Sequence, residues 1–191
     1  KREYDKALKD YDEAIRLNPK FAEAYSDRGD VYSAQKNYDR AIAEYGSAIR
    51  HSTKPAPFYL KRGSMHAKKN EHDKAIADYD RSISLEPGVA RAYSNRGLAY
   101  NAKNDSTRAV GDYSEAIRLD PLNTTYRLDR GNAYFAKREW DQALADYTKA
   151  VEIDPKHAAA YRNRGLVYAN KKENDLAIAE YTRAIGLAPR Y

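Results

Sequence analysis

The sequence contains no cysteine, only one methionine and one tryptophan, and its hydrophobic stretches are short. Without cysteine, disulfide bonds, thiolate metal sites and a cysteine nucleophile are excluded. No run of about 18 apolar residues occurs, so no transmembrane helix is predicted. No secretory signal opens the chain, which begins at Lys1 rather than at a methionine. These features favour a soluble, cytoplasmic protein and leave its compartment open.

The sequence also lacks the short motifs that identify common enzymes. It has no phosphate-binding loop, no glycine-rich dinucleotide turn, no calcium-binding loop and no His-Glu-x-x-His pattern. Its serine and threonine residues do not recur beside histidine or lysine, as a nucleophile and its base would. We therefore predict a protein that is not an enzyme and that binds no cofactor.

What the sequence does contain is a repeat of 34 residues without insertions. An arginine–glycine pair marks each unit, at positions 28–29, 62–63, 96–97, 130–131 and 164–165. An alanine lies twelve residues after each glycine and a tyrosine four residues further on, as in Ala41 and Tyr45. A proline ends most units, at positions 19, 87, 121, 155 and 189. This spacing indicates one structural unit used repeatedly.

Each unit is expected to form two helices. In residues 158–172, Tyr161, Gly165 and Tyr168 follow helical spacing and share one face, and the segment 175–187 repeats this pattern. The polar stretch between the two segments is short, so the helices must be antiparallel neighbours. Glycine and alanine are needed where the two backbones come closest, and proline ends the second helix because its ring blocks the next turn.

This spacing of glycine, alanine, tyrosine and proline resembles that of the tetratricopeptide repeat (TPR) family. The resemblance implies an all-α fold, a right-handed superhelical solenoid of antiparallel helix pairs, formed as a single array over residues 1–191. A half repeat precedes five full repeats, at 1–21, 22–55, 56–89, 90–123, 124–157 and 158–191. The resemblance also implies a non-enzymatic protein-protein interaction scaffold. Its concave groove, built from the first helices, would bind an extended peptide or a partner helix.

The 18 tyrosines and the net charge of +6 raise an alternative, because nucleic-acid-binding proteins use aromatic and basic side chains. All tyrosines but Tyr126 and Tyr191 fall on regular aromatic positions of the repeat, where core packing is expected, and Trp140 occupies such a position too. His66 and His72 also replace core aromatic residues, and two imidazoles without a third ligand predict no metal site. Basic residues gather where first helices end and acidic residues where second helices begin, so the charge forms no continuous basic stripe.

The period places the groove surface six, three and two residues before each glycine, and one, four and five residues after it. The predicted peptide-binding residues are Arg91, Asn95, Leu98, Leu128, Asn132, Phe135, Arg162, Asn163 and Leu166. The leucines and Phe135 have no expected core role and would take apolar side chains of the ligand. The asparagines can pair with a peptide backbone, and the arginines favour an acidic ligand. Glu23, Asp27 and Asp30 at the other end would repel that ligand and set its direction.

An acidic series accompanies the arginines. The residue before each second-helix tyrosine is acidic, at positions 10, 44, 78, 112, 146 and 180. Both series depart together from the residues common in the family, so we expect them to touch. The prediction pairs each acid with the arginine 18 residues later, as in Asp10–Arg28. The alternative pairs residues within one repeat, such as Arg28–Glu44.

Other roles stay open alongside the interaction scaffold. One is an architectural segment of a longer repeat array whose groove does little, and another, less favoured, is an RNA-binding arm. The terminal helices are expected to present apolar faces, because each repeat covers its core only with its neighbours, so end-to-end self-association is also predicted. The sequence does not name the partner. It predicts a protein or peptide in the groove, with no membrane and no nucleic acid.

Overall fold

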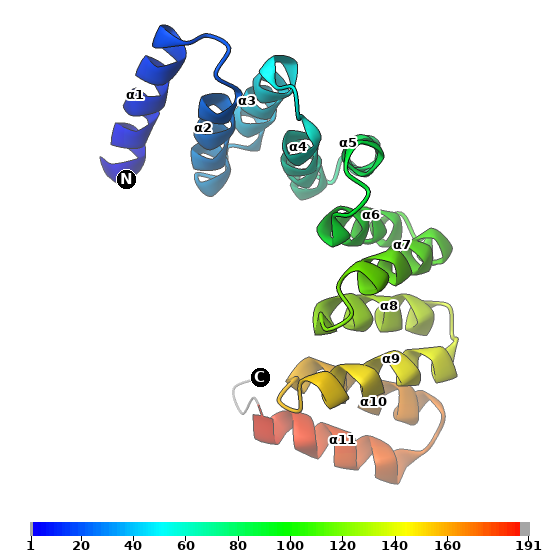
Figure 1. The fold of residues 1–191 in the computed structure, drawn as a ribbon. Coiled ribbons are helices and arrows are strands. Elements are labelled where there is room, and N and C mark those ends of the chain that lie inside the picture. The colour runs from blue at the N-terminus through cyan, green and yellow to red at the C-terminus, as the bar shows by residue number, and fades with distance from the viewer. Residues whose placement is uncertain (1, 188–191) are drawn as a thin grey trace. The chain divides into compact units, whose positions relative to one another are not determined.

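The structure is a computed structural model that describes residues 2–187 (Figure 1). The secondary structure of these residues consists of eleven helices joined by short turns. Their bounds are α1 Arg2–Leu17, α2 Ala22–Ala34, α3 Tyr38–His51, α4 Ala56–Lys68, α5 His72–Leu85, α6 Ala90–Ala102, α7 Ser106–Leu119, α8 Thr124–Ala136, α9 Trp140–Ile153, α10 Ala158–Asn170 and α11 Asn174–Leu187. From α2 onward, each stretch of 34 residues supplies two helices. The predicted all-α fold of helix pairs is confirmed, while the closing proline predicted at position 189 lies outside the described residues.

The chain divides into two compact units, one ending at Ala99 and the other beginning at Tyr100, within α6. In the first unit, α2 packs against α3 and α4 against α5, and contacts of α1 with α2 and of α3 with α4 join successive pairs. In the second unit, α8 packs against α9 and α10 against α11, and contacts of α7 with α8 and of α9 with α10 join them. In each unit, helices that follow one another in sequence are therefore neighbours in space, as in a solenoid.

The two helices of a pair come closest where glycine meets tyrosine. A Cβ atom added at Gly131 would lie 2.5 Å from Cε1 of Tyr147, and one added at Gly63 would lie 2.8 Å from Cε1 of Tyr79. Any residue larger than glycine would push the ring out of place at these positions. Both tyrosines are 1% exposed, so the predicted core packing of this tyrosine series is confirmed for them. The ring fills the space beside a backbone that has no side chain.

Another aromatic position is less completely buried. Tyr4 on α1 is 41% exposed, so its predicted place in the core is wrong. The reason is that α1 has its main packing surface on α2, and that surface does not cover the Tyr4 ring. Trp140, at the equivalent position of α9, is half-buried and packs against the cluster around Tyr147.

Four of the repeated arginines form ion pairs with the acid 16 residues later, on the second helix of the same repeat. The N–O distances are 2.7 Å for Arg28–Glu44, 2.6 Å for Arg62–Asp78, 2.7 Å for Arg130–Asp146 and 2.8 Å for Arg164–Glu180. The predicted pairing over 18 residues is wrong, and the within-repeat alternative holds for these four arginines. The glycine–tyrosine contact explains this result. It also spans 16 residues, and therefore brings together the residues that precede the glycine and the tyrosine.

Candidate functional site

The predicted binding residues lie on the first helices of the last three repeats. In order along α6, α8 and α10 they are Arg91, Asn95 and Leu98, then Leu128, Asn132 and Phe135, then Arg162, Asn163 and Leu166. The three on α6 have helical spacing that places them on one face. They belong to the first compact unit, and the residues on α8 and α10 belong to the second.

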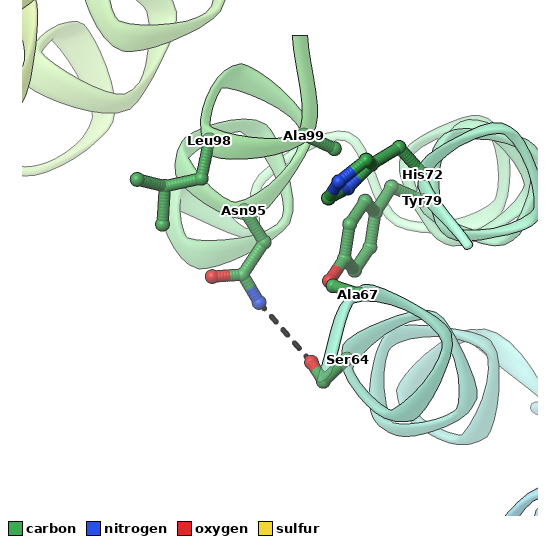
Figure 2. Close-up of a pocket in the computed structure, with 7 residues that line it drawn as sticks. All are labelled: Ser64, Ala67, His72, Tyr79, Asn95, Leu98 and Ala99. Carbon is green, nitrogen blue, oxygen red and sulfur yellow. Dashed lines mark hydrogen bonds between the residues drawn. The ribbon is translucent and has the colours of Figure 1, made fainter. Parts of the chain in front are cut away.

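In the first unit, Asn95 and Leu98 line a cavity of about 290 Å³ between α4, α5 and α6 (Figure 2). The other lining residues are Ser64 and Ala67 of α4, His72 and Tyr79 of α5, and Ala99 of α6. Asn95 Nδ2 donates a hydrogen bond to Ser64 Oγ at 3.3 Å. Leu98 is 48% exposed and points away from the two rings of α5. The structure thus brings two predicted site residues to one cavity and leaves Arg91 exposed beside it.

His72 and Tyr79 are the two aromatic residues that line this cavity, and neither belongs to the predicted site. Burial raises the pKa of the Tyr79 phenol, while the positive charge of Arg91 acts in the opposite direction. Nδ1 of His72 is buried and has no hydrogen-bond partner among the described residues. The available sequence signal was a histidine at the position that Tyr38 and Trp140 occupy in other repeats. The histidine is smaller than Tyr38 and Trp140, and only this comparison between repeats indicates an unfilled space.

In the second unit, the asparagines bond to one another. Asn163 Nδ2 donates to Asn132 Oδ1 at 2.8 Å, and the Tyr147 hydroxyl donates to the same oxygen at 2.8 Å. Asn163 is 8% exposed, and its Oδ1 faces Nε and Nη2 of Arg162 at 3.4 Å. The amide of Asn163 is therefore engaged within the protein. Asn132 is exposed, and its amide nitrogen remains available to a ligand.

Leu128 and Phe135 have a core role, contrary to the expectation from the repeat pattern. Leu128 packs against the cluster around Tyr147 and also against the cluster of Ala150, Val151 and Ala160. The Phe135 ring meets Trp140 edge to face, with 5.0 Å between ring centroids. Both side chains fold onto α9 because large neighbours there offer apolar surface. Of the apolar site residues, Leu98 and Leu166 remain exposed, at 48% and 39%.

Asp129 of α8 is a carboxylate that has no charged partner within residues 2–187. Burial raises its pKa to about 6. Its negative charge acts on the nearby Tyr113, whose hydroxyl accepts a hydrogen bond from Asn101 Nδ2 at 3.3 Å. Asn101 Oδ1 is buried and has no hydrogen-bond partner. The second unit thus contains a polar cluster, formed by Asn101, Tyr113 and Asp129, that has more hydrogen-bond acceptors than donors.

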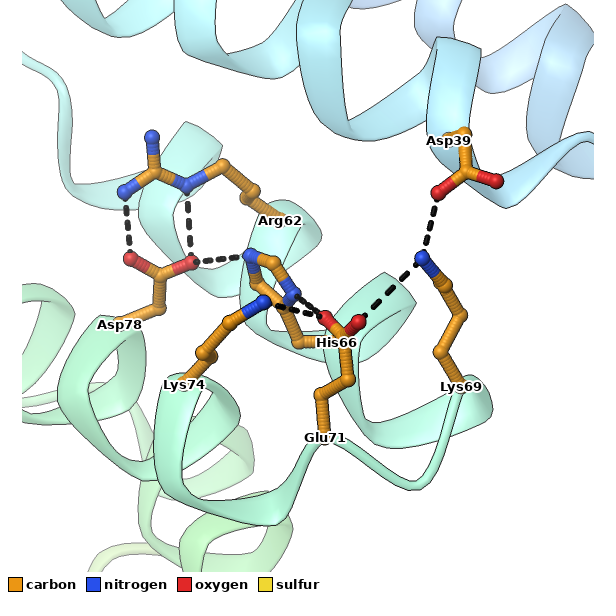
Figure 3. A network of polar contacts seen from close by, with 7 residues as sticks. All are labelled: Asp39, Arg62, His66, Lys69, Glu71, Lys74 and Asp78. Carbon is orange, nitrogen blue, oxygen red and sulfur yellow. Dashed lines mark hydrogen bonds and ion pairs between the residues drawn. The ribbon is translucent and has the colours of Figure 1, made fainter.

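His66 belongs to a network of charged side chains within the first unit (Figure 3). Its Nδ1 lies 2.6 Å from Oε2 of Glu71, and its Nε2 lies 3.9 Å from Oδ2 of Asp78. The His66 contact is the main reason that the pKa of Glu71 falls to about 2, and Lys69 and Lys74 contribute to this shift. Lys69 also pairs with Asp39, so the network extends to the preceding repeat. This histidine has a structural role.

None of the helices in the described part of the chain combines the length and the apolar character that crossing a membrane requires. Within residues 2–187, no three histidine, aspartate or glutamate side chains are grouped closely enough to hold a metal ion.

Family models identify the class of protein. A model described as TPR repeat matches residues 2–36, 63–104 and 131–172, and one described as tetratricopeptide repeat matches residues 90–121 and 158–191. The first model alone covers more than half of the chain. The protein therefore belongs to the tetratricopeptide repeat family, as its sequence pattern indicates. Comparison with curated proteins gives no match.

Solved structures share this fold. The crystal structure of MamA is 24% identical, has a TM-score of 0.79, and the match covers 85% of this chain and 95% of MamA. YrrB, described as a TPR protein with an unusual peptide-binding site, is 23% identical with a TM-score of 0.78, over 95% of this chain and 93% of YrrB. MamA from Desulfovibrio magneticus RS-1 is 17% identical with a TM-score of 0.81, over 87% of this chain and 94% of that one. At these identities the likeness establishes the TPR solenoid fold.

Proposed function

We propose that this protein is a non-enzymatic interaction scaffold that holds an extended peptide against the exposed faces of its first helices. The observation that carries the proposal is an exposed leucine on the same helix as an exposed arginine that has no acidic partner among residues 2–187, found in each unit. On α6, Leu98 is 48% exposed and Arg91 forms no ion pair among the described residues. On α10, Leu166 is 39% exposed, and Arg162 bonds only to the neutral Asn163.

The chemistry of these faces suits an extended, acidic peptide. The leucines offer apolar contact, and each arginine can pair with a carboxylate of the ligand. Oδ1 of Asn95 and Nδ2 of Asn132 are free to meet the N–H and C=O groups of a peptide backbone. The description of YrrB, which has the same fold, as a protein with a peptide-binding site agrees with this proposal.

A second candidate role, as part of a longer array or as a self-associating protein, rests on α11. Ile178 and Ile185 are 62% and 66% exposed. One repeat earlier, the residue equivalent to Ile185 is Val151, which is 8% exposed and packs against Ala160 of α10. The face of α11 could therefore be covered by another helix pair. Sedimentation of the wild type and of an Ile178→Glu, Ile185→Glu variant tests self-association through this face.

An RNA-binding arm has less support from the arrangement of the tyrosines. Arginine guanidinium groups lie over the rings of Tyr25, Tyr59 and Tyr161, at 5.6, 5.4 and 5.4 Å from their centroids. A ring covered on one face by a guanidinium, or buried as Tyr79 and Tyr147 are, offers less surface for stacking on nucleic-acid bases.

The proposed function is tested by selecting peptides from a random display library with the whole protein. Binding of a selected peptide is then measured by calorimetry. Two double variants are compared with the wild type, one with Arg91→Ala and Leu98→Ala and the other with Arg162→Ala and Leu166→Ala. At least one of them is expected to bind the peptide about tenfold more weakly. Circular dichroism should stay unchanged, because all four side chains are exposed.

The matched control carries Arg81→Ala and Leu122→Ala, which remove an exposed arginine and an exposed leucine elsewhere. This control should bind like the wild type. If both groove variants bind as well as the control, the peptide lies on another surface and the proposal fails.

A further inference from the structure

The cavity between α4, α5 and α6 has a counterpart two repeats later, because each lining position recurs there in the sequence. The counterpart residues are Asn132, Phe135, Trp140, Tyr147, Asn163, Leu166 and Val167. The tyrosine, the asparagine of the following repeat and the leucine are the same in both places. The main differences are in volume, because Ala67, His72 and Ala99 stand where the later repeats have a phenylalanine, a tryptophan and a valine.

In the second unit, the chain fills this space with its own aromatic side chains. Phe135 meets Trp140 at 5.0 Å between centroids, with an interplanar angle of 63°. Both rings pack against the cluster that contains Tyr147 and Val167. In the first unit, the smaller residues leave the cavity of about 290 Å³. This cavity is therefore lined by residues whose equivalents in the second unit surround the phenyl ring of Phe135.

Polar groups at the cavity narrow the choice of ligand. Nδ1 of His72 is closed off from solvent, so this nitrogen is not open to a group of the ligand. Arg91 is exposed, and its charge acts on Tyr79, which lines the cavity. Oδ1 of Asn95 faces outward from the Ser64 contact (Figure 2). The cavity therefore suits an apolar group inside, and Arg91 suits a negative charge outside.

We propose that this cavity binds one aromatic side chain of the partner peptide, with tryptophan preferred, and that an acidic residue next to it pairs with Arg91. The indole ring supplies the apolar volume that Phe135 and the larger ring of Trp140 supply in the counterpart. Pockets for whole drug-sized ligands measure about 300–1,000 Å³, so a cavity at the lower limit suits a single side chain. This inference rests on the proposed peptide-binding function and defines its specificity.

The test uses acetyl-Glu-Trp-Glu-amide as the probe, together with the same peptide carrying leucine or alanine in place of tryptophan. Each is titrated into the whole protein and followed by amide chemical shifts in NMR. We expect saturable shifts at Ala67, His72 and Ala99 with the tryptophan peptide. We also expect affinities lower by about tenfold or more for the alanine peptide, as is usual when an aromatic anchor is removed.

The decisive variant fills the cavity with the residues that the protein uses in its counterpart, Ala67→Phe, His72→Trp and Ala99→Val. It should lose tryptophan-dependent binding and keep its helical circular dichroism, with an unchanged or higher melting temperature. Should this variant not fold, the single change Ala99→Val narrows the same cavity and is expected to weaken binding in the same direction. The Arg81→Ala, Leu122→Ala control should bind like the wild type.

The proposal is overturned if the filled variant folds and binds the tryptophan peptide as the wild type does, or if the alanine peptide binds equally well. It is also overturned if the tryptophan peptide causes no shifts at the lining residues. If library-selected peptides lose affinity with Arg162→Ala and Leu166→Ala but not in the filled variant, the proposed function stands and the aromatic cavity is wrong. If neither the groove variants nor the filled variant bind the selected peptides more weakly than the wild type does, both proposals are contradicted.

Discussion

Arg130 holds Asp146 with two hydrogen bonds, Nε to Oδ2 at 2.8 Å and Nη2 to Oδ1 at 2.7 Å. The remaining nitrogen, Nη1, donates to Ser114 Oγ at 2.9 Å. One guanidinium on α8 thereby joins the second helix of its own repeat to the second helix of the repeat before. Arg164 repeats the arrangement with Glu180 and Thr148. These arginines link neighbouring repeats through a polar contact that the helix pairs alone do not provide.

The Arg130–Asp146 pair is expected to matter most when only one partner is removed. Arg130→Ala leaves the carboxylate of Asp146, which is 4% exposed, without its donor. Such a loss costs about 3–5 kcal/mol of the free energy of unfolding. Urea denaturation followed by circular dichroism measures the change. Replacing both residues, as Arg130→Met and Asp146→Leu, should recover a large part of it. A double variant as unstable as Arg130→Ala would show that the buried charge is not the cause.

Gly46 occupies the position of Ser114 and Thr148 in its own repeat, so Arg62 lacks the acceptor that Arg130 and Arg164 have there. A Cβ atom at Gly46 would lie 3.7 Å from Nη1 of Arg62, which leaves room for a side chain. Gly46→Ala should therefore stabilise the protein by roughly 1 kcal/mol through helix propensity. Gly46→Ser should do at least as well, because a new hydrogen bond adds about 1 kcal/mol. Thermal denaturation measures the stability of both variants. A Gly46→Ser variant clearly less stable than Gly46→Ala would exclude the added hydrogen bond to Arg62.

Asp129 makes stability depend on pH in an unusual direction. Its pKa of about 6 in the folded protein lies above the value of about 3.9 for an unfolded chain. The folded state therefore binds the proton more tightly, so stability falls as the pH rises from about 4 to 6 and stays reduced above this range. Asp129→Asn should raise the free energy of unfolding at pH 7.5 by about 1–3 kcal/mol. The gain should shrink as the pH is lowered towards 4.

The matched control for this prediction is Asp27→Asn, since Asp27 holds the same position of the repeat on α2 and is exposed. Urea denaturation should show a smaller gain at pH 7.5 for this control, because the Asp27 side chain is exposed. Equal pH profiles for the wild type and the Asp129→Asn variant would contradict the assignment.

Glu71 should titrate far below other glutamates. Its pKa of about 2 comes mainly from the contact with His66, with smaller contributions from Lys69 and Lys74. His66→Tyr places the tyrosine of other repeats at this position and should raise the pKa of Glu71 more than Lys74→Ala does. Because the pKa is lowered by folding, the pair stabilises the protein above about pH 4.3 and stops doing so as the pH falls through 2. Carboxyl carbon shifts in NMR measure the titration, and equal effects of the two substitutions would refute the leading role of His66.

The helix pairs could be predicted from the sequence because one contact recurs with the period. Gly131 and Tyr147 need each other, since the ring occupies the space that a Cβ atom would take. Because this contact recurs from repeat to repeat, the glycine and the tyrosine recur in the sequence with the same spacing. The exposed members of the candidate site, Leu98 and Leu166, were also predictable, because no core position of the repeat requires a leucine there.

The partners of long side chains could not be read from the period. An offset of 18 and one of 16 both fit the two charged series, and only the contact between the two helices of a repeat selects 16. Phe135 belongs to the groove positions by its spacing, yet it folds onto Trp140, a residue that differs from repeat to repeat. Asn163 is likewise held by Asn132 of the preceding repeat. These placements depend on which neighbour happens to be large or polar, information that an averaged repeat does not contain.

The most direct test of the peptide-scaffold function is to map a library-selected peptide on the whole protein by amide chemical shifts. We expect saturable changes on α6, α8 or α10, including the residues around Leu98, Asn132 or Leu166. Apart from the cavity residue His72 of α5, the second helices and α11 should be little affected. Changes confined to α11 or to the second helices, with the first-helix residues unmoved at saturation, would contradict it.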